Sequence, residues 1–109
     1  MDETLFHDSP QTIANLRRTL APETETAFRE FSRRAFADGA LPAETKELIA
    51  VAVAHVTQCP DCIRGHTRAA QRHGATAEEI MEAIWVAAEM RAGAAFAHSK
   101  IALDALRRE

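Results

Sequence analysis

The chain has 109 residues, of which 47% are hydrophobic and 27% are charged, and its net charge is −3. This is the size of one small domain, and the composition is ordinary for a soluble globular protein. The sequence lacks the clustered basic face that nucleic-acid binding requires and any apolar run near the roughly 20 residues that cross a bilayer. Residues 1–4 are acidic and lack the layout of a signal peptide. We therefore expect a cytoplasmic protein with no nucleic-acid or membrane partner.

The first half of the chain is predicted to form three helices. Alanine is abundant, tyrosine is absent and β-branched residues are sparse outside residues 49–56, a composition that favours helix. Prolines that can occupy a first helical turn predict a helix over 11–20 and a second from residue 22 to a left-handed cap at Gly39. The third is predicted over 43–58. Its middle is apolar on every side, so we expect a buried central helix.

The second half is predicted to form three more helices, which makes an all-α fold of about six helices in one domain, residues 1–109. One helix is expected over 60–72. The next is capped by Thr76, with Glu79 completing a capping box. Gly93 marks a break before a last helix over 94–106. The small residues between 87 and 97 leave little side chain between helices, so we expect the last two helices to contribute to a homo-oligomer.

The only two cysteines, Cys59 and Cys62, form a Cys-x-x-Cys motif. Pro60 suits the first position of a helix, which places Cys59 at the N-cap and Cys62 in the first turn, where the helix dipole stabilises negative charge. A cysteine becomes a nucleophile only as a thiolate. His66 lies four residues after Cys62, on the same helical face. The motif therefore reads as a redox dithiol with its own proton carrier.

Two other interpretations of the cysteines stay open from the residues alone. Zinc needs four ligands, and the cysteines and His66 offer three, with His55 or Glu47 as a conceivable fourth. The cysteines could also be inert. The charge of Asp61 beside both sulfurs disfavours a thiolate, an effect that Arg64 can offset.

Glu47 can contact the cysteine and histidine residues only if the tertiary structure brings their helices together. It lies twelve residues before Cys59, about 18 Å along a helix, so it cannot meet the thiols along its own helix. If the next helix folds back antiparallel, His66 lies between Glu47 and the cysteines, and a relay from Glu47 through His66 to Cys62 becomes possible. The alternative is a surface carboxylate. His55 is expected to be a core histidine with one hydrogen bond. The second possibility is that it contacts and positions the reactive side chains without reacting itself.

Glu47, the two cysteines and His66 together form a pattern that resembles the active-site motif of the AhpD-like alkylhydroperoxidases, within the carboxymuconolactone decarboxylase family. The turn and helix start at residues 74–80 and the segment 84–88 are also similar to that family. The resemblance covers roughly residues 41–106. AhpD proper carries a histidine before the second cysteine, where this chain has Asp61, and is longer, with two related halves.

The resemblance implies an all-helical fold around a helical hairpin that carries the Cys-x-x-Cys motif, in homo-oligomers that are often trimers or hexamers. It implies a dithiol that reduces hydroperoxides or exchanges disulfides, with Cys59, Cys62, His66 and Glu47 as the catalytic residues. No cofactor beyond the cysteine pair and no resident metal are expected. The implied partners are a hydroperoxide substrate and a thiol or lipoyl-type reductant protein. A disulfide exchanger without peroxidase activity and a metal-binding, non-enzymatic oligomer are the alternatives.

Overall fold

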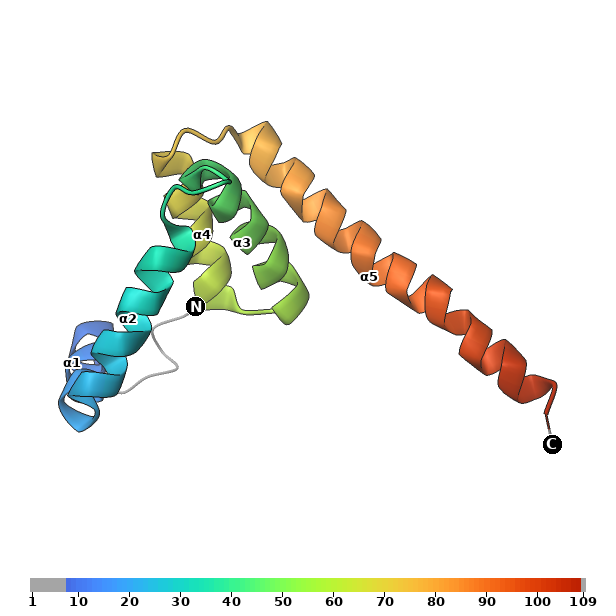
Figure 1. Cartoon of the computed structure of the whole chain (residues 1–109), viewed down its shortest axis with the longest axis horizontal. Coiled ribbons are helices and arrows are strands. Elements are labelled where there is room, and N and C mark those ends of the chain that lie inside the picture. The colour runs from blue at the N-terminus through green and yellow to red at the C-terminus, as the bar shows by residue number, and fades with distance from the viewer. Residues whose placement is uncertain (1–7, 109) are drawn as a thin grey trace. The chain divides into compact units, whose positions relative to one another are not determined.

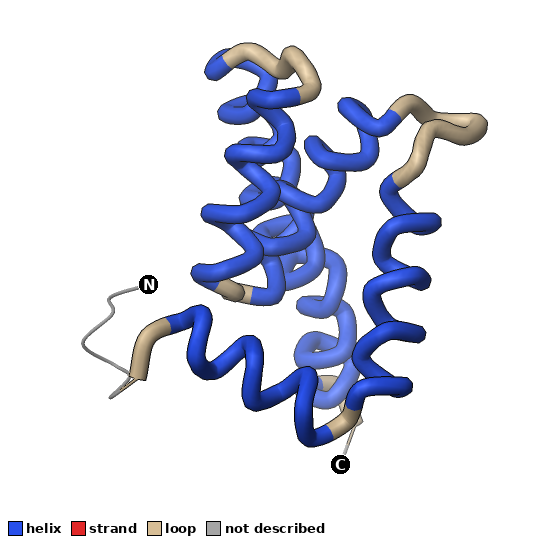
Figure 2. The backbone as a smooth tube through the Cα atoms, turned by 90° about the vertical axis from the view of Figure 1, so that its left-hand side faces the viewer, coloured by secondary structure: helices blue, strands red, loops and turns tan. Residues whose placement is uncertain are grey.

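A computed structural model describes residues 8–108 of the chain. These residues form helices and loops, with no strand among them (Figure 2). The all-α prediction is confirmed. The helices are α1 (Pro10–Leu20), α2 (Pro22–Phe36), α3 (Ala43–Thr57), α4 (Pro60–Arg72) and α5 (Ala77–Leu106).

The expected break at Gly93 is wrong, because α5 continues through it for 30 residues and the two last predicted helices are one. A glycine inside a helix costs only about 1 kcal/mol relative to alanine. That cost is too small to end a long helix with a favourable start. The described residues therefore hold five helices.

The chain divides into two compact units, residues 1–43 and residues 44–109. The first contains the helix pair α1 and α2, and the second contains nearly all of α3 together with α4 and α5. The single AhpD-like domain over residues 1–109, with its core motif in residues 41–106, stays a prediction.

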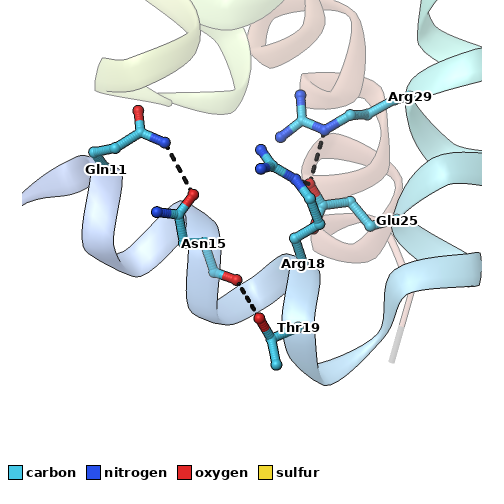
Figure 3. A network of polar contacts seen from close by, with 6 residues as sticks. All are labelled: Gln11, Asn15, Arg18, Thr19, Glu25 and Arg29. Carbon is cyan, nitrogen blue, oxygen red and sulfur yellow. Dashed lines mark hydrogen bonds and ion pairs between the residues drawn. The ribbon is translucent and has the colours of Figure 1, made fainter.

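In the first unit, polar contacts support the α1–α2 pair (Figure 3). Glu25 of α2 is buried and accepts a hydrogen bond of 2.8 Å from Nε of Arg29. Arg18 of α1 lies 3.6 Å from the same carboxylate oxygen, so the carboxylate joins the two helices. The Arg29 hydrogen bond, with the nearby arginine charges, holds the pKa of Glu25 below its usual value.

The predicted left-handed cap at Gly39 is wrong. Helix α2 ends at Phe36, and Ala37 follows in an extended conformation. Among the described residues, only Gln58 and Gly74 have positive φ. The loop is instead held by Asp38, whose carboxylate accepts a 2.6 Å hydrogen bond from the backbone N–H of Ala43. A carboxylate that accepts a hydrogen bond from a backbone N–H at the start of a helix satisfies one of the unpaired donors of that helix.

In the second unit, α3 and α4 lie side by side as a helical hairpin (Figure 1). A small core of four buried residues joins α3, α4 and the start of α5, and two half-buried residues pack against it. The four are Val51, Ala70, Ala75 and Ile80, and the two are Leu48 and Ile84. This core holds the hairpin in the arrangement that positions the cysteines.

The connection from α4 to α5 is as predicted. Gly74 follows the helix with φ +98°, and its N–H and that of Ala75 bond to the carbonyls of Gln71 and Ala70. This is a Schellman motif, which places glycine at its left-handed position. Thr76 then caps α5 in a complete capping box with Glu79.

The expectation that α3 is buried on every side is wrong for the single chain. Val51 and Ala54 are buried, whereas Ile49 and Val53 are about half exposed. One face of α3 packs on α4, whereas Val53 and Val56 line an open pocket of about 390 Å³ with residues of α5 and stay exposed. The all-round apolar sequence of α3 is therefore not fully explained within one chain. All residues of α5 from Ala94 onward are also exposed. No helix in the described part of the chain has both the length and the apolar character to cross a membrane.

Candidate active site

The start of α4 presents the cysteine pair. Cys59 is the N-cap with extended backbone, Pro60 occupies the first helical position, and Cys59 Sγ accepts a 3.2 Å hydrogen bond from the N–H of Cys62. The sulfur thus takes the place of the hydroxyl or carboxylate oxygen that usually satisfies this donor. This is the arrangement predicted from the position of Pro60.

Cys59 and Cys62 are joined by a disulfide, with their Cα atoms 5.2 Å apart. Both residues are half-buried. The structure is therefore the oxidised state of the pair, and the sulfurs lie at the surface end of the hairpin. Closing such a pair into a disulfide releases two electrons, and opening the disulfide takes up two.

Glu47 and His66 meet across the hairpin. Nδ1 of His66 lies 2.9 Å from Oε1 and 3.3 Å from Oε2 of Glu47. The Glu47 side chain is 6% exposed and that of His66 is 32% exposed. An ionised carboxylate can only accept a hydrogen bond, so Nδ1 of His66 is the donor in this contact. The antiparallel return of α4, which sequence spacing left conditional, brings this pair together.

The pair lies one helical turn from the disulfide. His66 and Cys62 are four residues apart on α4, the spacing at which side chains are neighbours on one face. Glu47 reaches His66 and does not need to reach the sulfurs. A carboxylate, an imidazole and a cysteine in this order match the general pattern of an orienting group, a base and a nucleophile.

His55 stands apart from this group. Its Nδ1 lies 2.7 Å from the carbonyl oxygen of Val51, one turn back on α3. A carbonyl only accepts, so Nδ1 is the donor. This is the single hydrogen bond expected of it, and its supporting role in the site stays a prediction.

Gln58 is a feature that the sequence analysis missed. It joins α3 to Cys59 with φ +60°, in the left-handed region. A non-glycine residue costs roughly 1–2 kcal/mol there, and such strain is often found at functional sites. The N–H of Cys59 bonds to the carbonyl of Ala54 across this turn, so the strained residue fixes where the N-cap cysteine sits. The short link between two strong helices, at residues 58–59, was the available signal.

The described residues contain no group of three or more histidine, cysteine or acidic side chains placed to hold a metal. Cys59 and Cys62 form a disulfide with each other, and His66 is hydrogen-bonded to Glu47.

An all-helical hairpin with a Cys-x-x-Cys disulfide at a helix start and a glutamate–histidine pair one turn away defines the class of AhpD-like proteins. The model of the carboxymuconolactone decarboxylase family matches residues 22–105, and the chain belongs to that family.

Two curated relatives are described as uncharacterised proteins. One, from Paracoccus denitrificans, is described as protein 4 in the cox locus. It is 67% identical over 82 residues, which are 75% of this chain and 74% of the relative. The other, from Cupriavidus necator, is 44% identical over 66% of this chain and 64% of its own length.

Solved structures agree in fold. An apo structure of a carboxymuconolactone decarboxylase family protein from Legionella pneumophila has a TM-score of 0.69 and 40% identity, over 73% of this chain and 71% of that one. A protein from Methanobacterium thermoautotrophicum has a TM-score of 0.72 and 34% identity, over 76% of this chain and 93% of that one. A family member from Thermotoga maritima has a TM-score of 0.56 and 27% identity, over 74% of this chain and 93% of that one. A part in the antioxidative response has been suggested for that protein.

Proposed function

We propose that this protein is a cytoplasmic thiol peroxidase that reduces organic hydroperoxides with the Cys59–Cys62 dithiol. The observation that carries the proposal is the Glu47–His66 hydrogen bond one turn from the cysteine pair. A structural disulfide needs no oriented imidazole beside it, whereas a thiol that must lose and regain a proton does. The antioxidative role suggested for the Thermotoga relative is consistent with this activity.

The oxidative half of the reaction begins at Cys62. His66 Nε2 takes the proton of the Cys62 thiol, and the thiolate attacks the terminal oxygen of the hydroperoxide. The O–O bond breaks, Cys62 becomes a sulfenic acid, and the alkoxide leaves as the alcohol with the proton from His66. Cys59 then attacks the Cys62 sulfur, and the S–O bond breaks with release of water. The pair has lost two electrons and is left as a disulfide.

Glu47 acts through His66. Its carboxylate holds Nδ1–H, which keeps Nε2 as the proton acceptor, and it stabilises the imidazolium that forms when the proton arrives. The low exposure of Glu47 strengthens this interaction, because water screens it less.

The reductive half requires a dithiol donor. A thiol or lipoyl-type reductant protein attacks Cys59 at the helix end, Cys62 leaves with a proton from His66, and a second donor thiol resolves the mixed disulfide. Two electrons and two protons return to the pair. Thiol–disulfide exchange of this kind depends on access to the attacked sulfur, which an N-cap position provides.

The test is to reduce the protein, remove the reductant and add one equivalent of cumene hydroperoxide. Alkylation mapped by mass spectrometry should show both thiols lost to a Cys59–Cys62 disulfide much faster than free cysteine reacts. Cys59→Ser should stop at a Cys62 sulfenic acid that dimedone traps, and Cys62→Ser should show no fast reaction. Unchanged turnover in Cys62→Ser would sink this mechanism. Fast reaction with disulfides and none with peroxide would establish the exchanger instead.

We also propose that the protein works as a homo-oligomer, a trimer or hexamer, as its resemblance to AhpD-like proteins implies. The support is the exposure of apolar side chains on α3, with Val53 52% exposed, and on the second half of α5, with Phe96 82% exposed. Light scattering after gel filtration should find the oligomer for wild type and Val53→Ala, and a smaller species for Val53→Asp. A monomeric wild type would refute the proposal.

A further inference from the structure

An open groove of about 700 Å³ runs along α4 on a different face from Cys62 and His66. Residues of α4 line most of it, and the end of α3 closes one side with His55 and Gln58. Pro60 and Ile63 line it too, and each directly follows one of the two cysteines. One end of the groove therefore adjoins the disulfide.

The groove is cationic. Arg64 and Arg68, one helical turn apart, both line it, and its lining contains no carboxylate. Like charges at this spacing repel each other, so an anion between them is favourable. Arg64 already takes part in another contact, so the argument rests chiefly on Arg68. Within residues 8–108, Arg68 forms no ion pair.

The remaining lining fits an aliphatic chain that leads to the anion. Ile63, which directly follows Cys62, supplies an apolar surface, and Thr67 adds a residue with a hydroxyl group to the lining. Arg68 follows Cys62 by six residues, which is about 9 Å along the helix. A ligand that meets both must carry its reactive group and its charge at opposite ends of a short chain.

We propose that this groove binds the carboxylate of small straight-chain substrates, so that a hydroperoxide or thiol at the other end of the chain reaches the Cys59–Cys62 pair. The reaction at the cysteines rests on the proposed function, whereas binding of the carboxylate does not. Arg68 is the residue that selects anionic over neutral substrates. The groove thus makes the protein specific for organic acids carrying a peroxide or thiol.

Binding is tested with hexanoate and 1-hexanol, which differ in the charged end and cannot react with cysteine. In amide NMR titrations of the disulfide form, hexanoate should shift the signals of residues 63–71 saturably and bind more tightly than 1-hexanol. Arg68→Gln should weaken the binding of hexanoate three- to five-fold, which is the effect expected from the loss of an exposed charge pair. Arg72→Gln is the matched control, because Arg72 is exposed on the same helix and does not line the groove.

Equal binding of hexanoate and 1-hexanol would overturn the proposal, as would an equal loss in the Arg68 and Arg72 variants. The second result would indicate general attraction to a basic helix. Saturable shifts with an acidic peptide and none with hexanoate would also overturn it, in favour of a protein partner.

Reactivity is tested by reducing the disulfide with 6-mercaptohexanoate and 6-mercapto-1-hexanol. Each variant is described by the ratio of the two rate constants, which cancels the intrinsic reactivity of the disulfide. The ratio should fall three- to five-fold in Arg68→Gln and also at high salt, since salt screens exposed charges. A ratio that is the same in wild type and Arg68→Gln would overturn the substrate assignment. Neither experiment uses peroxide, so failure of the peroxidase proposal would be seen separately.

Discussion

The hydrogen bond between Glu47 and His66 should contribute measurably to the folding free energy. The two atoms Nδ1 and Oε1 lie 2.9 Å apart, one side chain is 6% exposed and the other 32%. Hydrogen bonds to charged groups contribute about 1.5–3 kcal/mol, and fully exposed ion pairs contribute about 0–1 kcal/mol. With one partner buried and the other about one-third exposed, we expect a coupling energy of about 1–2 kcal/mol.

A double-mutant cycle measures this coupling. Wild type, Glu47→Ala, His66→Ala and the double variant are unfolded in urea and followed by far-UV circular dichroism. The coupling is the stability change of the double variant less the sum of the single changes. All four are compared at one protein concentration, because self-association shifts apparent stability. The disulfide is kept oxidised throughout, so that only the hydrogen bond differs.

Glu89→Ala combined with His66→Ala serves as the control, because Glu89 is exposed on α5. That pair should be additive within about 0.5 kcal/mol. If the Glu47–His66 coupling is no larger than the control, the contact does not hold α3 against α4, and the reasoning that a buried carboxylate orients His66 is refuted.

Two further predictions concern other parts of the chain. Arginine partners lower the pKa of Glu30 to about 2 and lower that of Glu25, from a usual value of 4.5. Lowered values stabilise the folded state above pH 4.5, and this stabilisation is lost as the pH falls toward 2. NMR signals of Glu30 and Glu25 should therefore shift in that window, as the two carboxylates take up protons and their ion pairs weaken. Glu30→Gln should reduce the pH dependence, and an unchanged profile would contradict the assignment. Thr76→Ala should lower the urea-unfolding free energy by about 1 kcal/mol through loss of the α5 cap, whereas Thr76→Ser should keep it; equal losses would contradict the capping role.

Much of the local structure was predictable because its causes are local. Pro60 at the first helical position placed Cys59 at the N-cap, and Thr76 with Glu79 marked the start of α5. Gly74 has the positive φ that a Schellman motif needs. Each of these depends on residues within one or two turns of chain, so sequence reading could find them.

The errors came where local signals were weak or where packing decides. Gly93 looked like a break, but one glycine costs less than the rest of a long helix gains. Gly39 looked like a helix cap, although α2 ends three residues earlier. The left-handed Gln58 could not be found from composition, because the hairpin imposes that conformation on a residue that disfavours it.

The sequence by itself determined the all-helical class, the helix that presents the cysteines and the placement of Cys62 and His66 on one face, because helical periodicity relates residues four apart. Only the tertiary structure decided that Glu47 contacts His66. Its carboxylate lies 19 residues from His66, and it is the return of α4 along α3 that brings the two within 2.9 Å. The groove beside the disulfide likewise exists only once two helices lie together. Contacts between two helices depend on how their faces pack. The periodicity within one helix carries no information about which residues of another helix lie close to it.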